Sequence, residues 1–162
     1  EFEKAPDEVV ATEQDLMQAL FGRDLLSPEF EQHEGISAAG QANTPSGHPA
    51  LYAYVIEDPS DPDTIAGMAI WFLNYSTWDG KHGVYLEDLY VRPQFRGQGM
   101  GKALLQRLAQ VCVENDYSRF QWWVLDWNEP AIEVYRAIKA QAMDEWTIYR
   151  VSGQALIDLA GQ

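Results

Sequence analysis

Three glycines within five positions, in RGQGMGKALL (residues 96–105), constrain the fold of this chain more than any other feature. A strand-like run, VYLEDLYV (84–91), precedes them, and apolar residues at helical spacing follow from 101 to 115. Glycine costs about 0.5–1 kcal/mol where a helix accepts alanine. A strand, a glycine turn and a helix bring unpaired backbone N–H groups and the positive end of the helix dipole together. The sequence therefore predicts an anion site at this turn.

The two best-known phosphate-binding motifs do not fit the turn. A P-loop ending at Gly101-Lys102 needs glycine at position 96 and a hydroxyl residue at 103, where Arg96 and Ala103 stand. A dinucleotide fingerprint needs glycine at 102, which is Lys102. What remains is the pattern Arg-x-x-Gly-x-Gly.

The hydrophobic pattern predicts an α+β fold with a mixed sheet flanked by helices, formed by one domain over residues 1–162. Asn128 is a predicted helix cap, with Pro130 in the first turn of the helix that follows. A loop rich in Ser, Gly and Pro covers 27–50, and a hairpin connection covers 78–83. The predicted strands are 50–58, 64–76, 84–91, 119–126 and 145–152, and the predicted helices are 12–22, 101–115, 129–139 and 153–160.

Composition limits the classes of function. Of the 162 residues 46% are hydrophobic, yet no apolar run reaches the roughly 18–20 residues of a membrane span, so no membrane partner is expected. The net charge of −14 argues against nucleic acid and suits cationic ligands, although solubility alone also explains it. The single cysteine, Cys112, forms no internal disulfide and favours a cytoplasmic location. His33, His48 and His82 have no metal-ligand spacing, so no metal is expected.

Arg96, Gly99 and Gly101 resemble the acetyl-CoA-binding motif of the Gcn5-related N-acetyltransferases (GNAT). The blocks YLEDLYVRPQFRGQGMGKALL (85–105) and LDWNEPAIEVY (125–135) are similar to the spermidine/spermine (diamine) acetyltransferase branch. The resemblance implies acetyl-CoA as cosubstrate and a homodimeric enzyme. It places the cofactor contacts at Leu89, Tyr90, Val91, Arg96, Gly97, Gln98, Gly99, Met100, Gly101, Lys102, Asn128, Glu129, Pro130 and Ala131.

Acetyl transfer to an alkylamine needs a proton acceptor, because an amine with a pKa near 10.4 is almost entirely protonated at pH 7. Departure of the thiolate needs a proton donor. The resemblance implies Glu87 as the base, acting through water, and Tyr135 as the donor. A solvated strand carboxylate and a core tyrosine are the structural alternatives. Glu87 and Asp88 are neighbours on a predicted strand, so we expect their side chains to point to opposite faces.

Substrate recognition is implied only by the resemblance. Phe2 replaces a tyrosine of the family and lacks its hydroxyl, and Trp78 is placed to stack on an ammonium chain. Trp122 and Trp123 are adjacent, so at least one of them is expected to pack in the core. The candidate substrate residues are Phe2, Glu3, Trp78, Glu87, Asp88, Gln121, Trp122, Trp123 and Glu145, with Asp144 beside the last.

The sequence departs from the family in two places. We expect this chain to begin after the family's first strand and helix, with EFEK at the end of that helix, and these elements are either missing or only trimmed. Lys139 stands near a position that is commonly glycine, so we expect it either to adopt positive φ or to end the helix differently.

These observations predict an acetyl-CoA-dependent N-acetyltransferase of small cationic amines such as diamines, polyamines or lysine-like thioether amines. A protein or peptide lysine acetyltransferase is one alternative, which the 27–50 loop would obstruct. A non-catalytic acetyl-CoA-binding sensor is the other, and it has no chemical need for Tyr135.

Overall fold

The computed structural model describes Thr12, Leu20 and residues 51–161. The chain divides into two compact units, Glu1–Trp123 and Val124–Gln162, and each is described by itself. Several sequence predictions fall outside the described residues: the loop 27–50, nearly all of the helix 12–22, and the candidate residues Phe2, Glu3, His33 and His48.

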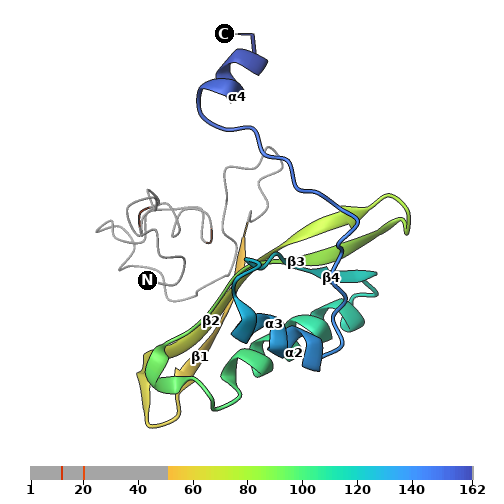
Figure 1. Ribbon diagram of the computed structural model, residues 1–162. Coiled ribbons are helices and arrows are strands. Elements are labelled where there is room, and N and C mark those ends of the chain that lie inside the picture. Colours follow the sequence, from red (N-terminus) through yellow and green to blue (C-terminus); the bar gives the residue numbers. More distant parts are fainter. Residues whose placement is uncertain (1–11, 13–19, 21–50, 162) are drawn as a thin grey trace, which may run out of the picture. The chain divides into compact units, whose positions relative to one another are not determined.

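A four-stranded mixed sheet forms the first unit (Figure 1). The strands are β1 (Tyr52–Asp58), β2 (Asp61–Ser76), β3 (Lys81–Val91) and β4 (Arg119–Gln121), and they lie in that order. The first three strands are antiparallel and β4 runs parallel to β3. This arrangement confirms the predicted α+β class and the mixed sheet. The strand predicted over 119–126 is shorter than expected, because ladder pairing stops at Gln121.

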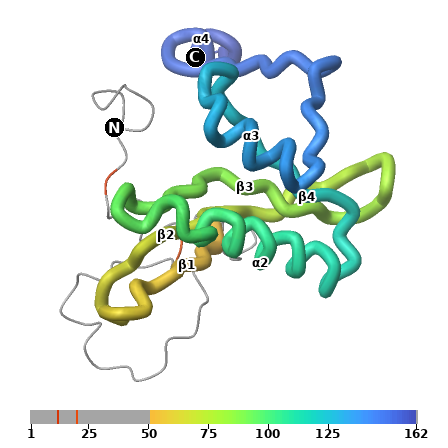
Figure 2. The backbone as a smooth tube through the Cα atoms, turned by 60° about the horizontal axis from the view of Figure 1, so that its bottom comes forward, coloured from red at the N-terminus to blue at the C-terminus, as the bar shows by residue number. Residues whose placement is uncertain are grey.

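Helix α2 (Met100–Glu114) covers one face of the sheet, as the tube in Figure 2 shows. The helical spacing predicted its buried side, which consists of Leu104, Leu105, Leu108, Val111 and Cys112. These side chains share the core with Val84, Leu86 and Trp71 of the sheet. Fully burying one leucine contributes about 1.5–3 kcal/mol, so this face holds the unit together. Cys112 is a core residue, as predicted.

A β-bulge interrupts β3 beside Trp71. Ile70 of β2 pairs with Asp88, but the next residue, Trp71, pairs with Leu86, so Glu87 is the extra residue. Cross-strand partners lie on the same face, which places Leu86 with Trp71 against α2 and Asp88 with Ile70 on the opposite face. A bulge of this kind changes which side chains face each side of the sheet.

The strands are held closely at the β3–β4 junction. A Cβ added to Gly83 would lie 2.5 Å from Cγ of Arg119 and 2.6 Å from Oδ1 of Asn74, so only glycine fits. Asn74 donates from Nδ2 to Oε1 of Gln121 at 2.9 Å, and Arg119 donates to the backbone oxygen of Tyr75 at 2.9 Å. These bonds link β2 to β4 across β3, and they fix where β4 ends.

The second unit contains α3 (Glu129–Ala137) and α4 (Gln154–Leu159). Lys139 follows α3 with φ +63°, which confirms the positive φ considered from the sequence. The N–H of Ala140 donates to Tyr135 O at 3.0 Å and that of Lys139 to Arg136 O at 2.9 Å. These two bonds form a Schellman motif, which satisfies the last carbonyl groups of the helix.

The predicted strand 145–152 is wrong for this structure. Residues 147–152 belong to no strand, and the side chains of Trp146, Ile148, Tyr149 and Val151 are exposed. An alternating pattern produces a strand only where a sheet edge receives its backbone hydrogen bonds, and no described strand pairs with this segment. Among the described residues, no helix has the length and apolar character needed to cross a membrane.

Candidate active site

The glycine turn between β3 and α2 has the backbone geometry that its sequence predicted. Gly97 and Gly99 have φ of +76° and +83°, values that side-chain-bearing residues rarely adopt. A Cβ at either position would meet no atom within 4 Å, so the glycines are needed for conformation and leave the backbone open to a ligand. A 3₁₀ turn, η3 (Pro93–Phe95), separates β3 from these residues.

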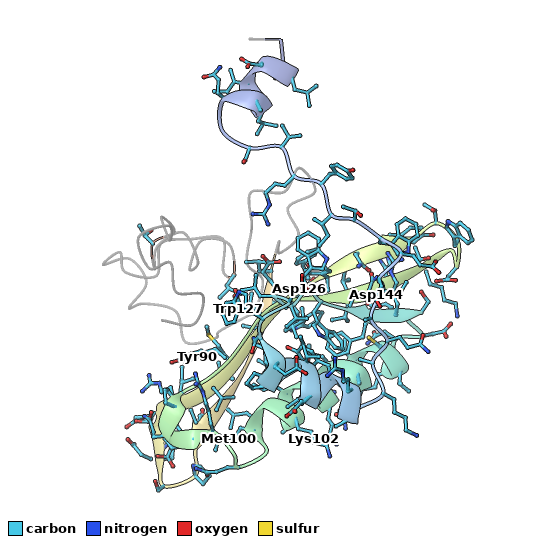
Figure 3. All side chains as sticks on the ribbon, viewed as in Figure 1. Tyr90, Met100, Lys102, Asp126, Trp127 and Asp144 are labelled. Carbon is cyan, nitrogen blue, oxygen red and sulfur yellow. The ribbon has the colours of Figure 1, made fainter. Side chains whose placement is uncertain are left out.

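The first turn of α2 has the electrostatics of an anion site. Gly99 is the N-cap, so no side chain caps the helix, and the first turn contains no acidic residue. It contains Lys102 instead, and a cation at the positive end of a helix dipole is unfavourable unless an anion offsets it. Figure 3 labels Met100 and Lys102 in this turn and Tyr90 near the end of β3. An anion bound at these backbone amides would offset both the helix dipole and the charge of Lys102.

Arg96 has a structural role in the same turn. Its Nε donates to the backbone oxygen of Val91 at 2.9 Å, and its guanidinium carbon lies 5.8 Å from the centre of the Tyr90 ring. These contacts tie the glycine turn to the end of β3. Because one donor is used in this way, Arg96 positions the turn whether or not it also meets a ligand.

The last residues of β3 pair with no described strand on the β4 side. The strand pairs with β2 through Val91, but it pairs with β4 only over Gly83–Tyr85. Among the described strands, none lies beside Leu89, Tyr90 and Val91 on the β4 side. The contacts of their peptide groups to an extended ligand arm, which the resemblance implied, stay a prediction.

The β3 bulge corrects the prediction that Glu87 and Asp88 point to opposite faces. Tyr85 and Glu87 are two residues apart and share a face, and the register places Asp88 on that face as well. Alternation fails here because Glu87 is the extra residue of the bulge. Both carboxylates are exposed. The face of the sheet opposite α2 therefore holds two acidic side chains together.

Tyr85 lies beside Glu87 on the same face, and sequence reasoning did not single it out. Its ring lies 4.9 Å from that of Phe72 and 5.8 Å from that of Trp123, the latter edge-on at 88°. Burial, with a contribution from the charge of Glu87, raises the pKa of Tyr85 to about 12, so its hydroxyl stays neutral. The signal was present in YLED, because a residue two positions before Glu87 must share its face.

The structure separates the two tryptophans after β4, as expected for neighbours. The Trp122 ring contacts Phe120 at 4.8 Å, whereas Trp123 contacts Tyr85 and is 57% exposed. Gln121 hydrogen-bonds to Asn74 on the same face as Tyr85. Trp78 lies in the turn between β2 and β3 and is 95% exposed, as predicted for a loop residue.

The remaining candidates lie in the second unit. Asn128 is the N-cap of α3, as predicted, and is buried, but its side chain makes no capping hydrogen bond. Its backbone oxygen accepts from the N–H groups of Ala131 and Ile132 instead. Burial raises the pKa of Tyr135, which keeps its hydroxyl protonated near neutral pH. Asp144 and Glu145 are exposed.

The described residues contain no cluster of three His, Cys, Asp or Glu side chains able to hold a metal ion. His82 contacts the rings of Tyr75 and Tyr117 instead.

Comparison with known proteins places this geometry in a family. The sequence profile of the Acetyltransferase (GNAT) family matches residues 15–138, which include the glycine turn, Glu87 and Tyr135. The chain is 37% identical over 153 residues to thialysine N-epsilon-acetyltransferase of Bos taurus, which covers 91% of this chain and 89% of that protein. It is 30% identical to spermidine/spermine N(1)-acetyltransferase-like protein 1 of Homo sapiens, covering 70% of this chain and 17% of that protein.

The fold is also found in solved structures. An integron cassette protein from the mobile metagenome of V.cholerae aligns with a TM-score of 0.68 at 24% identity, covering 99% of this chain and 84% of that one. This likeness concerns the fold alone. Together with the family profile and the relatives, it leads to one conclusion: the chain belongs to the GNAT family of N-acetyltransferases, in the branch that is similar to thialysine and spermidine/spermine acetyltransferases.

Proposed function

We propose that this chain transfers the acetyl group of acetyl-CoA to a primary amine of a small cationic molecule. The observation that carries the proposal is the pairing of an open glycine turn at the start of α2 with two carboxylates on one face of β3. Relatives named for thialysine and for L-ornithine (Arabidopsis thaliana, 34% identical) favour a lysine-like amine, a diamine or a polyamine as the acceptor amine.

The residues of the glycine turn fit acetyl-CoA. Gly97 and Gly99 leave the backbone open, and the uncapped start of α2 suits a pyrophosphate. The edge of Leu89–Val91, which pairs with no described strand on the β4 side, suits the pantetheine arm. Acetyl-CoA supplies the acetyl group as an activated thioester. Further contacts are proposed for Arg96, Gln98, Met100, Gly101, Lys102, Asn128, Glu129, Pro130 and Ala131.

Glu87 is the proposed base. It is exposed on the face that carries Asp88, so two negative charges attract an ammonium group and favour its approach. Glu87 accepts the proton of the ammonium through water, which generates the neutral amine needed for attack. Asp88 binds the acceptor amine. The other proposed contacts to it are Phe2, Glu3, Trp78, Gln121, Trp122, Trp123 and Glu145.

Tyr135 is the proposed proton donor for the leaving sulfur. A raised pKa keeps its proton available at the pH where the enzyme works. Glu87 and Tyr135 belong to different units, and the family profile runs through both, so we propose that residues 1–162 act as one catalytic domain. The proposal also includes a cytoplasmic location and a homodimer, and the exposed apolar side chains between Met143 and Leu159 support the homodimer.

Free-thiol release from acetyl-CoA tests the reaction class. The acceptors are thialysine, ornithine, putrescine, spermidine and a lysine-containing peptide, each against a blank without acceptor. Turnover on the small amines with little on the peptide is the expected result. Turnover on the peptide alone would establish the peptide lysine acetyltransferase instead. Absence of turnover with every acceptor, while acetyl-CoA still binds, would establish the sensor and overturn the proposal.

A further inference from the structure

The aromatic side chains on the face of the sheet opposite α2 form a continuous row beside the two carboxylates. Phe72, Tyr85 and Trp123 come from β2, β3 and the residues after β4, and Tyr85 is in contact with both others. We call these three residues the aromatic wall. Tyr85 and Glu87 share a face two residues apart, so the wall stands directly beside the proposed base.

The two parts of this surface recognise different parts of a molecule. Carboxylates attract an ammonium group, whereas aromatic rings bind methylene or thioether groups and attract a cation over their faces. Trp123 is 57% exposed, so its ring is available to a ligand. Tyr85 meets Trp123 edge-on, and this contact limits the positions that the Trp123 ring can adopt.

We propose that Tyr85 is a specificity-determining residue, which holds the aromatic wall against the unbranched apolar arm of the acceptor amine. The enzyme then prefers amines with several methylene or thioether groups next to the reacting nitrogen over compact amines. This inference rests on the proposed function and adds to it a residue that selects among acceptor amines by the length of their apolar arm.

The dependence of kcat/KM on chain length tests the inference. The probes are straight-chain alkylamines from ethylamine to hexylamine, measured as substrates and as competitors of putrescine or thialysine. Each added methylene that leaves water raises kcat/KM, or lowers the inhibition constant, by about two- to fourfold. A variant that is merely less stable lowers the values for all amines equally and leaves the slope unchanged.

In Tyr85→Leu, we expect each added methylene to raise kcat/KM by less than about 1.5-fold. Tyr85→Phe keeps the ring, so it should retain the wild-type increase. Tyr75→Leu is the matched control: it removes a half-exposed β2 tyrosine that contacts His82, and it should retain the wild-type slope. If Tyr85→Leu does not fold, Trp123→Ala replaces it as the test, because Trp123 is exposed. In Trp123→Ala, kcat/KM must then no longer rise with the chain length of the amine.

The outcomes separate the two proposals. A flat slope in the wild-type enzyme, or an unchanged slope in the folded Tyr85→Leu or Trp123→Ala variant, overturns the role of the aromatic wall while the reaction stands. Absence of both turnover and inhibition with every amine overturns the proposed function and this inference together.

Discussion

Lys139 ends α3 in a conformation that suits glycine. Its φ of +63° places a side-chain-bearing residue in the left-handed region, at a cost of roughly 1–2 kcal/mol. Glycine avoids that strain but loses about 0.5–1 kcal/mol of backbone entropy. We therefore expect Lys139→Gly to raise the free energy of unfolding by about 0.5–1 kcal/mol, measured by urea denaturation. Lys139→Ala keeps the strain and should give no gain. Equal stabilisation by both variants would contradict this account.

The raised pKa of Tyr85 makes the free energy of unfolding depend on pH in the alkaline range. Its pKa of about 12 lies above the value near 10 of an unfolded chain, so between these pH values only the unfolded state loses the proton. Stability from this group is therefore fully present below pH 10 and is lost as the pH rises toward 12. Wild type should lose stability between pH 9 and 11 more steeply than Tyr85→Phe, as measured by urea midpoints. Parallel losses would contradict the raised pKa.

Among the helices and strands, α2 has the most direct link between backbone conformation and function, because its N-terminus is the proposed site for the phosphates of acetyl-CoA. Gly99→Ala adds strain at a φ of +83° and places a methyl group where a phosphate would approach. We expect the KM for acetyl-CoA to rise about tenfold, which corresponds to about 1.4 kcal/mol of binding. The KM for the acceptor amine should change little. Steady-state kinetics with varied acetyl-CoA measures the effect.

Gly80→Ala is the matched control for the glycine turn. Gly80 has a similar φ of +65° but lies in the turn between β2 and β3. Both variants should lose similar stability, and only Gly99→Ala should weaken acetyl-CoA. An unchanged KM in Gly99→Ala would remove the turn from the cofactor site.

The sequence predicted those features that depend on neighbouring residues. The glycine turn, the buried side of α2 and the positive φ of Lys139 are local, because each follows from a few adjacent residues. The bulge at Glu87 is not local: it exists only in the pairing of β3 with β2, and single-strand alternation placed Asp88 on the wrong face. The same limit applies to 145–152, where the pattern was strand-like but no described strand pairs with it.

For the whole molecule, the proposed homodimer rests on the exposed apolar side chains of the C-terminal segment. Trp146 is 73% and Tyr149 91% exposed, and Met143, Ile148, Leu156 and Leu159 are exposed as well. Large apolar side chains that stay exposed in a single chain are often buried at protein interfaces. We expect a dimer whose dissociation constant rises at least about tenfold in Trp146→Glu, since burying a charge in place of an indole is costly. Sedimentation velocity over a concentration series measures it.

Val113→Glu is the control for self-association. Val113 is an exposed apolar residue on α2, so the variant adds the same charge outside the C-terminal segment. Its dissociation constant should match that of wild type. A wild-type protein that remains monomeric at all concentrations would contradict the dimer.

The central claim is that this chain acetylates small amines with Glu87 as base and Tyr135 as proton donor. The most direct measurement is the rate of thiol release with thialysine and spermidine for wild type, Glu87→Gln and Tyr135→Phe. The controls are Glu57→Gln, at an exposed β1 carboxylate, and Tyr149→Phe, at an exposed tyrosine of the second unit. We predict a loss of about 10²-fold or more in kcat for each site variant, and wild-type rates for both controls. Wild-type rates in Glu87→Gln and Tyr135→Phe would contradict the account.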